Sequence, residues 1–153
     1  MNIRIVNKKE KKEILRELER NFGINIRGYV LLKNRKFHIF SGNLKEKDIE
    51  KMEKEIRIER IGMVVFKKEN FGIRLSFDLL NLLKPTKSIM EISDFLAKMW
   101  LSGKEIEIKN EKLKKEKERK VTILKNKNDF IGCGYVKEGK IKNFVPKERR
   151  VFK

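Results

Sequence analysis

The chain has 153 residues, a formal net charge of +18 at pH 7 and 39% hydrophobic residues. That apolar content is enough for packed cores and excludes a wholly disordered chain. The positive excess predicts a polyanionic partner, because a strong positive field attracts polyanions and speeds their association. One alanine, no glutamine and abundant lysine, glutamate and isoleucine are also typical of thermophile surfaces with ion-pair networks. Such networks explain charges of both signs but not the positive excess.

Apolar spacing in the first half predicts alternating helices and strands. We expect a helix over 9–21 ended by Gly23, followed by a hairpin of strands 28–33 and 36–40. A second helix, capped by Asn43, and a strand over 57–67 come next. The half then closes with a turn at 70–72, a short strand after it, and a short helix from Ser76 through Leu83. The predicted domain boundary is Lys84-Pro85-Thr86, since a proline disfavours helical geometry in the residue before it. The first domain would therefore cover residues 1–83.

The second half predicts one helix and a group of antiparallel strands. Ser93 can cap a helix from Asp94 to Leu101, with Gly103 as the helix stop. Strands are expected over 105–108, 121–125, 130–137 and 140–145. Between them, segment 109–120 is almost wholly charged, which is typical of a mobile, solvated loop or an extended hairpin tip. This charged loop would serve either solubility or electrostatic contact with RNA.

Single residues and missing motifs exclude several kinds of site. Cys133 is the only cysteine and His38 the only histidine, so an internal disulfide or a multi-Cys metal site is excluded. We expect Cys133 to be a small packed residue and His38 a strand-face residue, with no metal and no cofactor. No apolar run reaches the roughly 20 residues that span a bilayer, and the amino terminus lacks a secretory h-region. We therefore expect a cytoplasmic protein without a membrane segment.

No motif in the sequence indicates catalysis. There is no Gly-rich phosphate loop with a following Lys-Ser/Thr, and Gly132-x-Gly134 lacks the third glycine and the helix of a dinucleotide fingerprint. The ligands of a zinc deaminase are also missing. Carboxylates are plentiful in so charged a chain, and their presence has no diagnostic value. We expect a protein that is not itself an enzyme.

The residue order from position 93 onward resembles the PUA domain, a small β-barrel-like RNA-binding module. In that family a helix ending in Leu-x-Gly-x-x-Ile/Val precedes the second strand, and Leu101, Gly103 and Ile106 match this pattern. The family's ligand groove lies beside that helix and strand. The resemblance implies an α+β fold, with a small α/β pre-PUA domain followed by a PUA-like β-barrel over residues 84–153.

A narrower resemblance is to the carboxy-terminal region of the Sun-family RNA cytosine methyltransferases. That region ends in a pattern similar to Gly-x-Gly followed by Lys-Asn-x-Leu-Pro-Lys-Gly-Leu-Arg. Matching residues here are Gly132, Gly134, Lys142, Asn143, Pro146, Lys147 and Arg150. Val145 is a conservative change, while Glu148 and Arg149 replace Gly-Leu. The first half matches the α/β domain that precedes PUA domains by layout only.

The large catalytic domain of that family has no room in this chain. The resemblance therefore implies an RNA-binding tail without the enzyme, so that any methyltransferase activity would come from a partner chain. The expected RNA-binding residues are Trp100, Gly103, Lys104, Lys142, Asn143, Lys147, Arg149 and Arg150.

Three of the expected roles have alternatives that the sequence leaves open. Trp100 could stack on a base or belong to the core, and Asn143 could touch RNA or the protein's own backbone. Gly132 and Gly134 could allow close backbone approach, form a β-bulge or make room for tight packing.

The resulting hypothesis is an RNA-binding protein of rRNA or tRNA modification or ribosome biogenesis. The alternative is the RNA-targeting subunit of a split RNA cytosine methyltransferase. A third interpretation is a ribosome-assembly scaffold that binds protein partners through the first domain.

Overall fold

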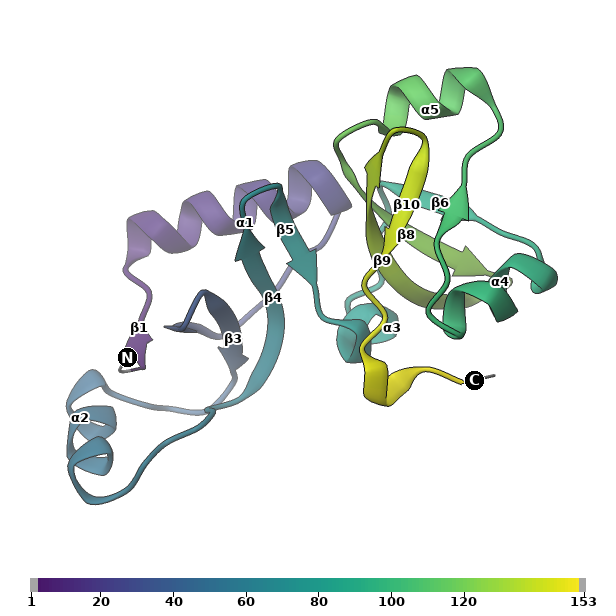
Figure 1. The fold of residues 1–153 in the computed structure, drawn as a ribbon. Helices are drawn as coiled ribbons and strands as arrows, with labels where there is room; N and C mark the ends of the chain where they lie inside the picture. Colours follow the sequence, from purple (N-terminus) through teal and green to yellow (C-terminus); the bar gives the residue numbers. More distant parts are fainter. Residues whose placement is uncertain (1–2, 152–153) are drawn as a thin grey trace.

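The structure is a computed structural model that describes residues 3–151, apart from the side chain of Tyr29. The fold is α+β, as expected: two five-stranded sheets lie next to each other, with helices around them (Figure 1). The first sheet is an antiparallel meander in the order β1-β2-β3-β4-β5. Its strands are β1 (Arg4–Ile5), β2 (Tyr29–Lys33), β3 (Lys36–Phe40), β4 (Met63–Glu69) and β5 (Gly72–Leu75).

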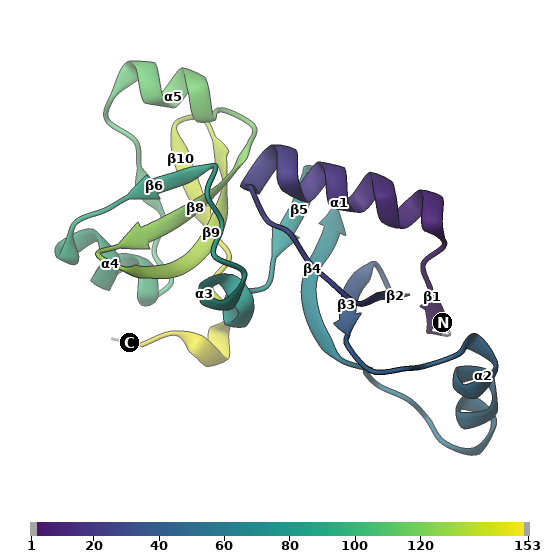
Figure 2. The same ribbon diagram turned by 180° about the vertical axis from the view of Figure 1, so that it is seen from behind.

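Helix α1 (Lys8–Phe22) covers one face of the first sheet and confirms the helix predicted over 9–21 (Figure 2). The Asn7 side chain accepts a hydrogen bond from the Glu10 backbone N–H, which caps the first turn. Gly23 ends the helix in a left-handed conformation with φ of 62°, which glycine adopts without a Cβ clash. The predicted 28–33 and 36–40 hairpin is also present, as β2 and β3.

Two details of the first half differ from the prediction. Helix α2 (Glu46–Glu55) begins three residues after Asn43, and Asp48 accepts the hydrogen bond from the Lys45 N–H at its start. The strand expected over 57–67 begins only at Met63. The preceding Gly62 has a φ of 73° and lies against the Ile39 carbonyl, a backbone geometry that extended strand residues do not adopt. A 3-10 turn, η1 (Phe77–Leu79), and α3 (Leu80–Leu83) then form the predicted short helix.

The second sheet has the order β6-β8-β9-β10-β7 and curls into a half-barrel. Its strands are β6 (Ile89–Glu91), β7 (Ile106–Glu107), β8 (Val121–Asn126), β9 (Asp129–Lys137) and β10 (Lys140–Asn143). The predicted strands are all present, although β7 and β10 are shorter. Strand β6, which the sequence did not reveal, pairs in parallel with β8. Helix α4 (Asp94–Leu101) has the predicted bounds, and the Ser93 hydroxyl accepts from the Leu96 N–H.

The charged segment 109–120 is not the extended loop or hairpin tip that its composition predicts. It contains helix α5 (Glu111–Lys117), whose first turn is capped because the Asn110 side chain accepts from the Leu113 N–H. Glu118 then accepts from the backbone N–H groups of Glu138 and Gly139 in the β9–β10 turn. Local capping and this anchor order a segment whose charges alone favour a loop.

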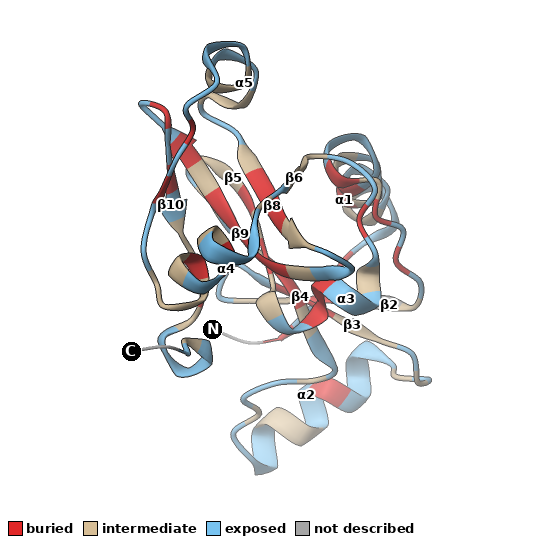
Figure 3. Ribbon diagram, turned by 90° about the vertical axis from the view of Figure 1, so that its right-hand side faces the viewer, coloured by how far each residue is buried: buried red, intermediate tan, exposed pale blue. Residues whose placement is uncertain are grey.

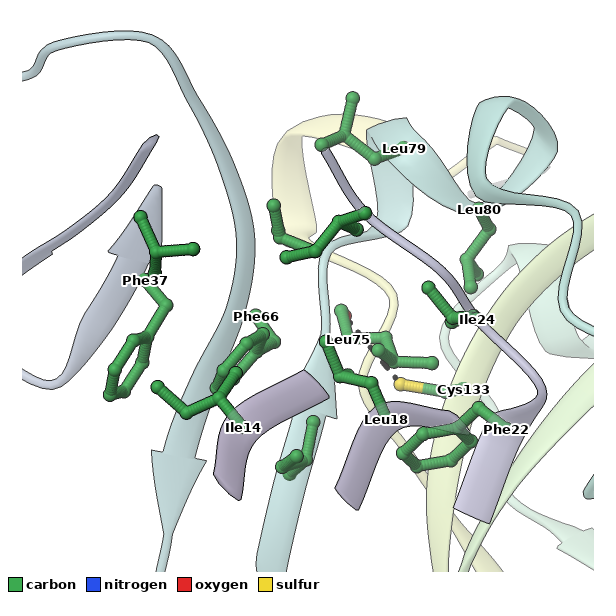
Figure 4. Close-up of a cluster of buried hydrophobic side chains, with 14 of the residues drawn as sticks. Ile14, Leu18, Phe22, Ile24, Phe37, Phe66, Leu75, Leu79, Leu80 and Cys133 are labelled. Carbon is green, nitrogen blue, oxygen red and sulfur yellow. Dashed lines mark hydrogen bonds between the residues drawn. The ribbon is translucent and has the colours of Figure 1, made fainter. Parts of the chain in front are cut away.

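One hydrophobic core is shared by the two halves of the chain (Figures 3 and 4). Ile14, Leu18 and Phe22 of α1 pack with residues of the first sheet and also with Ile123 and Cys133 of the second. Cys133 is buried, as expected, and burial raises the pKa of its thiol to about 11. The division into residues 1–83 and 84–153 remains a prediction. No helix among residues 3–151 is both long and apolar enough to cross a bilayer.

Candidate nucleic-acid interface

Trp100 anchors helix α4 to the second sheet from within the core. Its side chain is 0% exposed, and Nε1 donates to the Ile131 carbonyl at 2.7 Å. A Cβ on Gly132 would lie 3.0 Å from that nitrogen, and one on Gly134 would lie 2.8 Å from the far edge of the indole ring. The two glycines therefore make room for the Trp100 ring. This geometry corresponds to the core interpretation of Trp100, because the ring has no exposed face on which a base could stack.

Gly132 also forms a β-bulge. Ile123 pairs with Cys133 and Lys125 pairs with Phe130, so Leu124 alone opposes two residues of β9. Gly132 has a φ of 119°, and the extra residue of a bulge is the place where such a conformation is common. Bulge formation and tight packing, which the sequence left as alternatives, therefore occur together.

Asn143 ties the end of α4 to the end of β10. Its Nδ2 donates to the Trp100 carbonyl at 2.7 Å and to the Lys104 carbonyl at 2.8 Å. Its Oδ1 accepts from the Val145 N–H at 2.8 Å. Both protons of the Asn143 amide are donated to backbone carbonyls. Of the two roles that the sequence leaves open, the structure therefore shows the contact with the protein's own backbone.

Arg150 continues the same junction. Its Nε donates to the Val145 carbonyl at 3.2 Å, and its guanidinium lies over Gly103, where a Cβ would be 2.7 Å from Nε. Gly103 has a φ of 95° and its N–H donates to the Trp100 carbonyl. The glycine thus ends the helix, as predicted, and admits the arginine to its surface. Gly103, Lys104, Asn143 and Arg150 are brought together by these contacts.

Arg149 points to a different neighbour. Its Nε and Nη2 donate to the two carboxylate oxygens of Asp78 at 2.8 and 3.3 Å, which links the 3-10 turn η2 (Lys147–Arg149) to η1 in the first half. The hydrogen bond to Asp78 raises the pKa of the Arg149 guanidinium. With one carboxylate already bound in a two-point geometry, this arginine presents less free positive charge than its position in the sequence suggests.

Three predicted lysines remain exposed: Lys104, Lys142 and Lys147. Within residues 3–151 their ammonium groups form no salt bridge and no hydrogen bond to a side chain. They do not all share one side, however. Lys142 is paired with Tyr135 across β9–β10 and alternates with Asn143, so its side chain leaves the opposite face of the strand.

Two clusters near this region had no signal in the sequence. Phe71 stacks on Tyr135 with ring centroids 4.7 Å apart and on Phe144 at 5.3 Å, which joins the β4–β5 turn to the second sheet. Arg74 lies 4.5 Å from the centre of the Phe144 ring and donates to the Phe144 carbonyl. These residues come from distant parts of the chain, so only the aromatic type of Phe71, Tyr135 and Phe144 could have marked them. Within the described part of the chain, His, Cys, Asp and Glu side chains form no group of three or more that could hold a metal ion.

Comparison with known proteins finds a family match for the second half of the chain. Residues 87–151 match the family described as the methyltransferase RsmF PUA domain. Residues 87–151 are therefore similar to a PUA domain. The match begins within a few residues of the predicted boundary and includes α4, Gly103 and the strands through β10.

The whole fold is also similar to a solved structure described as a conserved PUA domain protein from Thermoplasma acidophilum. The TM-score is 0.58 at 15% sequence identity, and the match covers 99% of this chain and 100% of that one. No curated protein matches the chain. The match agrees with the expected resemblance to the carboxy-terminal region of the Sun family, and it indicates RNA binding in RNA modification.

Proposed function

We propose that this chain is an RNA-binding protein of rRNA or tRNA modification or ribosome biogenesis. It binds structured RNA through the cations at the junction of α4, β10 and η2. The similarity to a PUA domain supports this proposal most strongly, because it places an RNA-recognition module in a chain whose net charge is +18. Phosphate contacts of this kind release counterions and make the affinity steeply dependent on salt.

The geometry supports a division of labour among the predicted residues. Lys104 and Lys147 are exposed and directly follow Gly103 and Pro146, so they act as phosphate contacts. Arg150 is held over Gly103 and presents part of its guanidinium beside them. Asn143 fixes the backbone from which Lys104 projects, and Trp100 fixes the helix from within the core.

The test replaces Lys104 and Lys147 by alanine and measures binding to transfer RNA and ribosomal RNA fragments across a salt series. We expect weaker binding and a slope of log affinity against log salt that falls by up to about one unit for each phosphate that is no longer neutralised. The control replaces Lys8 and Lys12, two exposed lysines of α1, and removes the same charge elsewhere. Equal effects of both pairs would reduce the interaction to net charge and would contradict a site at this junction.

A second candidate function follows from the family match to a methyltransferase PUA domain. In this alternative the chain delivers RNA to the catalytic chain of a split RNA cytosine methyltransferase. Affinity purification from its native cells, with RNase treatment, would recover a methyltransferase chain. Recovery of ribosome-assembly proteins instead would favour the scaffold role, and recovery of neither would favour an RNA-binding protein that acts alone.

A further inference from the structure

A row of cations crosses three strands of the first sheet. Lys36 of β3 is paired with Lys67 of β4, and Lys67 is paired with Arg74 of β5. Directly paired residues project from the same face, with strands about 4.8 Å apart, so the row spans about 10 Å. Like charges placed directly opposite each other destabilise a sheet. The row therefore has an energetic cost, which the Lys67–Glu69 ion pair and the Arg74–Phe144 contacts offset only in part, because Lys36 has no acidic partner within residues 3–151.

The row lies on the face of the sheet that α1 does not cover. Phe37, Phe66 and Leu75 are paired with one another in the same register and pack in the core with α1. Each cation of the row is the chain neighbour of one of these residues, and successive side chains of a strand point to opposite faces. Figures 1 and 2 show α1 behind and then in front of β4 and β5, in agreement with this assignment.

The cation row leads into a groove between the first sheet and the PUA domain. The groove is lined by Lys36, Lys67, Arg74, Phe77, Phe144 and Pro146. Asp78, which also lines it, is already bound by Arg149. Lys67 contacts Glu69 at 3.0 Å, whereas Lys36 has no acidic partner within residues 3–151. The groove thus combines positive charge with an aromatic wall.

The aromatic wall continues toward the PUA strands. Phe144 stacks on Phe71, and Phe71 stacks on Tyr135. Lys142 is the direct partner of Tyr135 and projects from the same face as Phe144, two residues further along. Partly buried aromatic residues therefore lie between the exposed Lys36 and the exposed Lys142. This face is distinct from the junction around Gly103 and Asn143.

We propose that this groove is a second RNA-contact site, which takes a single-stranded segment. A cation row beside aromatic rings is suited to single strands, since phosphates bind the lysines and an unpaired base stacks on a planar group such as the Arg74 guanidinium. A duplex keeps its base faces stacked inside the helix and cannot use the Phe144 and Arg74 surface. The inference rests on the proposed RNA-binding function and extends it to the first half of the chain.

The experiment compares two double variants. The groove variant carries Lys36→Thr and Lys67→Thr, and the control variant carries Lys137→Thr and Lys140→Thr. The control pair is also a directly opposed pair of exposed lysines, and lies at the β9–β10 turn near α5. The probes are a short oligouridylate and an RNA duplex of equal length. We expect only the groove variant to bind oligouridylate more weakly, with the salt slope reduced by about 0.7 for each phosphate that is no longer neutralised. Its thermal midpoint should change little, because relief of the like-charge pairing offsets the loss of the Lys67–Glu69 ion pair.

Crosslinking gives a second readout that does not depend on a variant. Ultraviolet irradiation of the wild-type complex with oligouridylate should attach uridine to the tryptic peptide 143–147, which contains Phe144. Lys36→Thr with Lys67→Thr should reduce that adduct.

The outcomes separate this inference from the proposed function. No binding of wild-type protein to any RNA would overturn both. Binding that depends on Lys104 and Lys147 but not on Lys36 and Lys67, with no adduct on peptide 143–147, would overturn the groove alone. An equal loss of duplex and single-strand affinity would overturn the assignment to single strands.

Discussion

At the scale of single residues, several side chains that the sequence predicts to contact RNA mainly hold the backbone in place. Asn143 satisfies two carbonyls and one N–H of the α4–β10 junction. Arg149 is bound to Asp78, and Trp100 is enclosed. The residues left for a ligand are the exposed lysines and the outer part of Arg150. Polar and aromatic side chains near a site therefore build its frame, while the cations around that frame carry the positive charge.

Asn143→Ala is expected to destabilise the protein. The change leaves two carbonyls and one N–H without their present partner, and each intramolecular hydrogen bond contributes about 1 kcal/mol, so a loss of roughly 2–3 kcal/mol in the free energy of unfolding is expected. Denaturant unfolding measures it. Asn128→Ala, in the exposed β8–β9 turn, is the control and should change little. A wild-type stability for Asn143→Ala would show that water replaces the amide at no cost.

At the scale of elements, caps decide where the charged helices begin. The segment over 109–120 has the composition of a solvated loop, yet Asn110 supplies an N-cap and Leu113 packs against the second core. Burial lowers the pKa of the Lys117 ammonium at the end of the same helix. A short helix gains most of its stability from packing and caps rather than from intrinsic propensity, which explains why charge composition was misleading here.

Asn110→Ala should loosen α5 without unfolding the domain. Loss of an N-cap costs about 0.5–2 kcal/mol, which is large for a helix of seven residues. Limited digestion with trypsin, followed by mass spectrometry, should show faster cleavage at Lys112, Lys114 and Lys115. Asn7→Ala, which removes the cap of α1 instead, should leave cleavage in this segment unchanged. Equal cleavage in both variants would mean that Glu118 alone holds the segment.

At the scale of the whole molecule, the two halves are joined by more than the chain between them. Ile123 and Cys133 share a core with α1. Cys133 lies next to Leu75 (Figure 4), and its Sγ is 3.6 Å from the Leu75 carbonyl. Arg149–Asp78 and the Phe71 stack add surface contacts. The groove proposed for single-stranded RNA is formed by this junction, so its geometry depends on how the halves pack.

The fragment 84–153 is expected to be less stable than the intact chain, although its boundary is the one that the sequence predicts. Separation exposes the buried side chains of Ile123 and Cys133, and full burial of a large apolar side chain contributes about 1.5–3 kcal/mol. Thermal unfolding of the fragment and of the intact chain measures the difference. Equal midpoints would mean that the two parts are energetically independent, and two separate transitions in the intact chain would support the same conclusion.

The sequence by itself determined the elements whose signals are local. Helical apolar spacing, the Ser93 cap and the glycine stops depend on neighbours within one or two turns, and α1, α4 and the closing strands follow the prediction. The PUA resemblance was also readable, because Leu101, Gly103 and Ile106 lie close together along the chain.

The tertiary structure decided whatever depends on contacts between distant residues. The pairing of β6 with β8, the enclosure of Trp100, the hydrogen bonds of Asn143 and the cation row on the first sheet all join segments far apart in sequence. A lysine has the same local signal whether it faces solvent alone or stands opposite another lysine. Only strand register places Lys36, Lys67 and Arg74 side by side, and only packing between the halves sets that row beside Phe144.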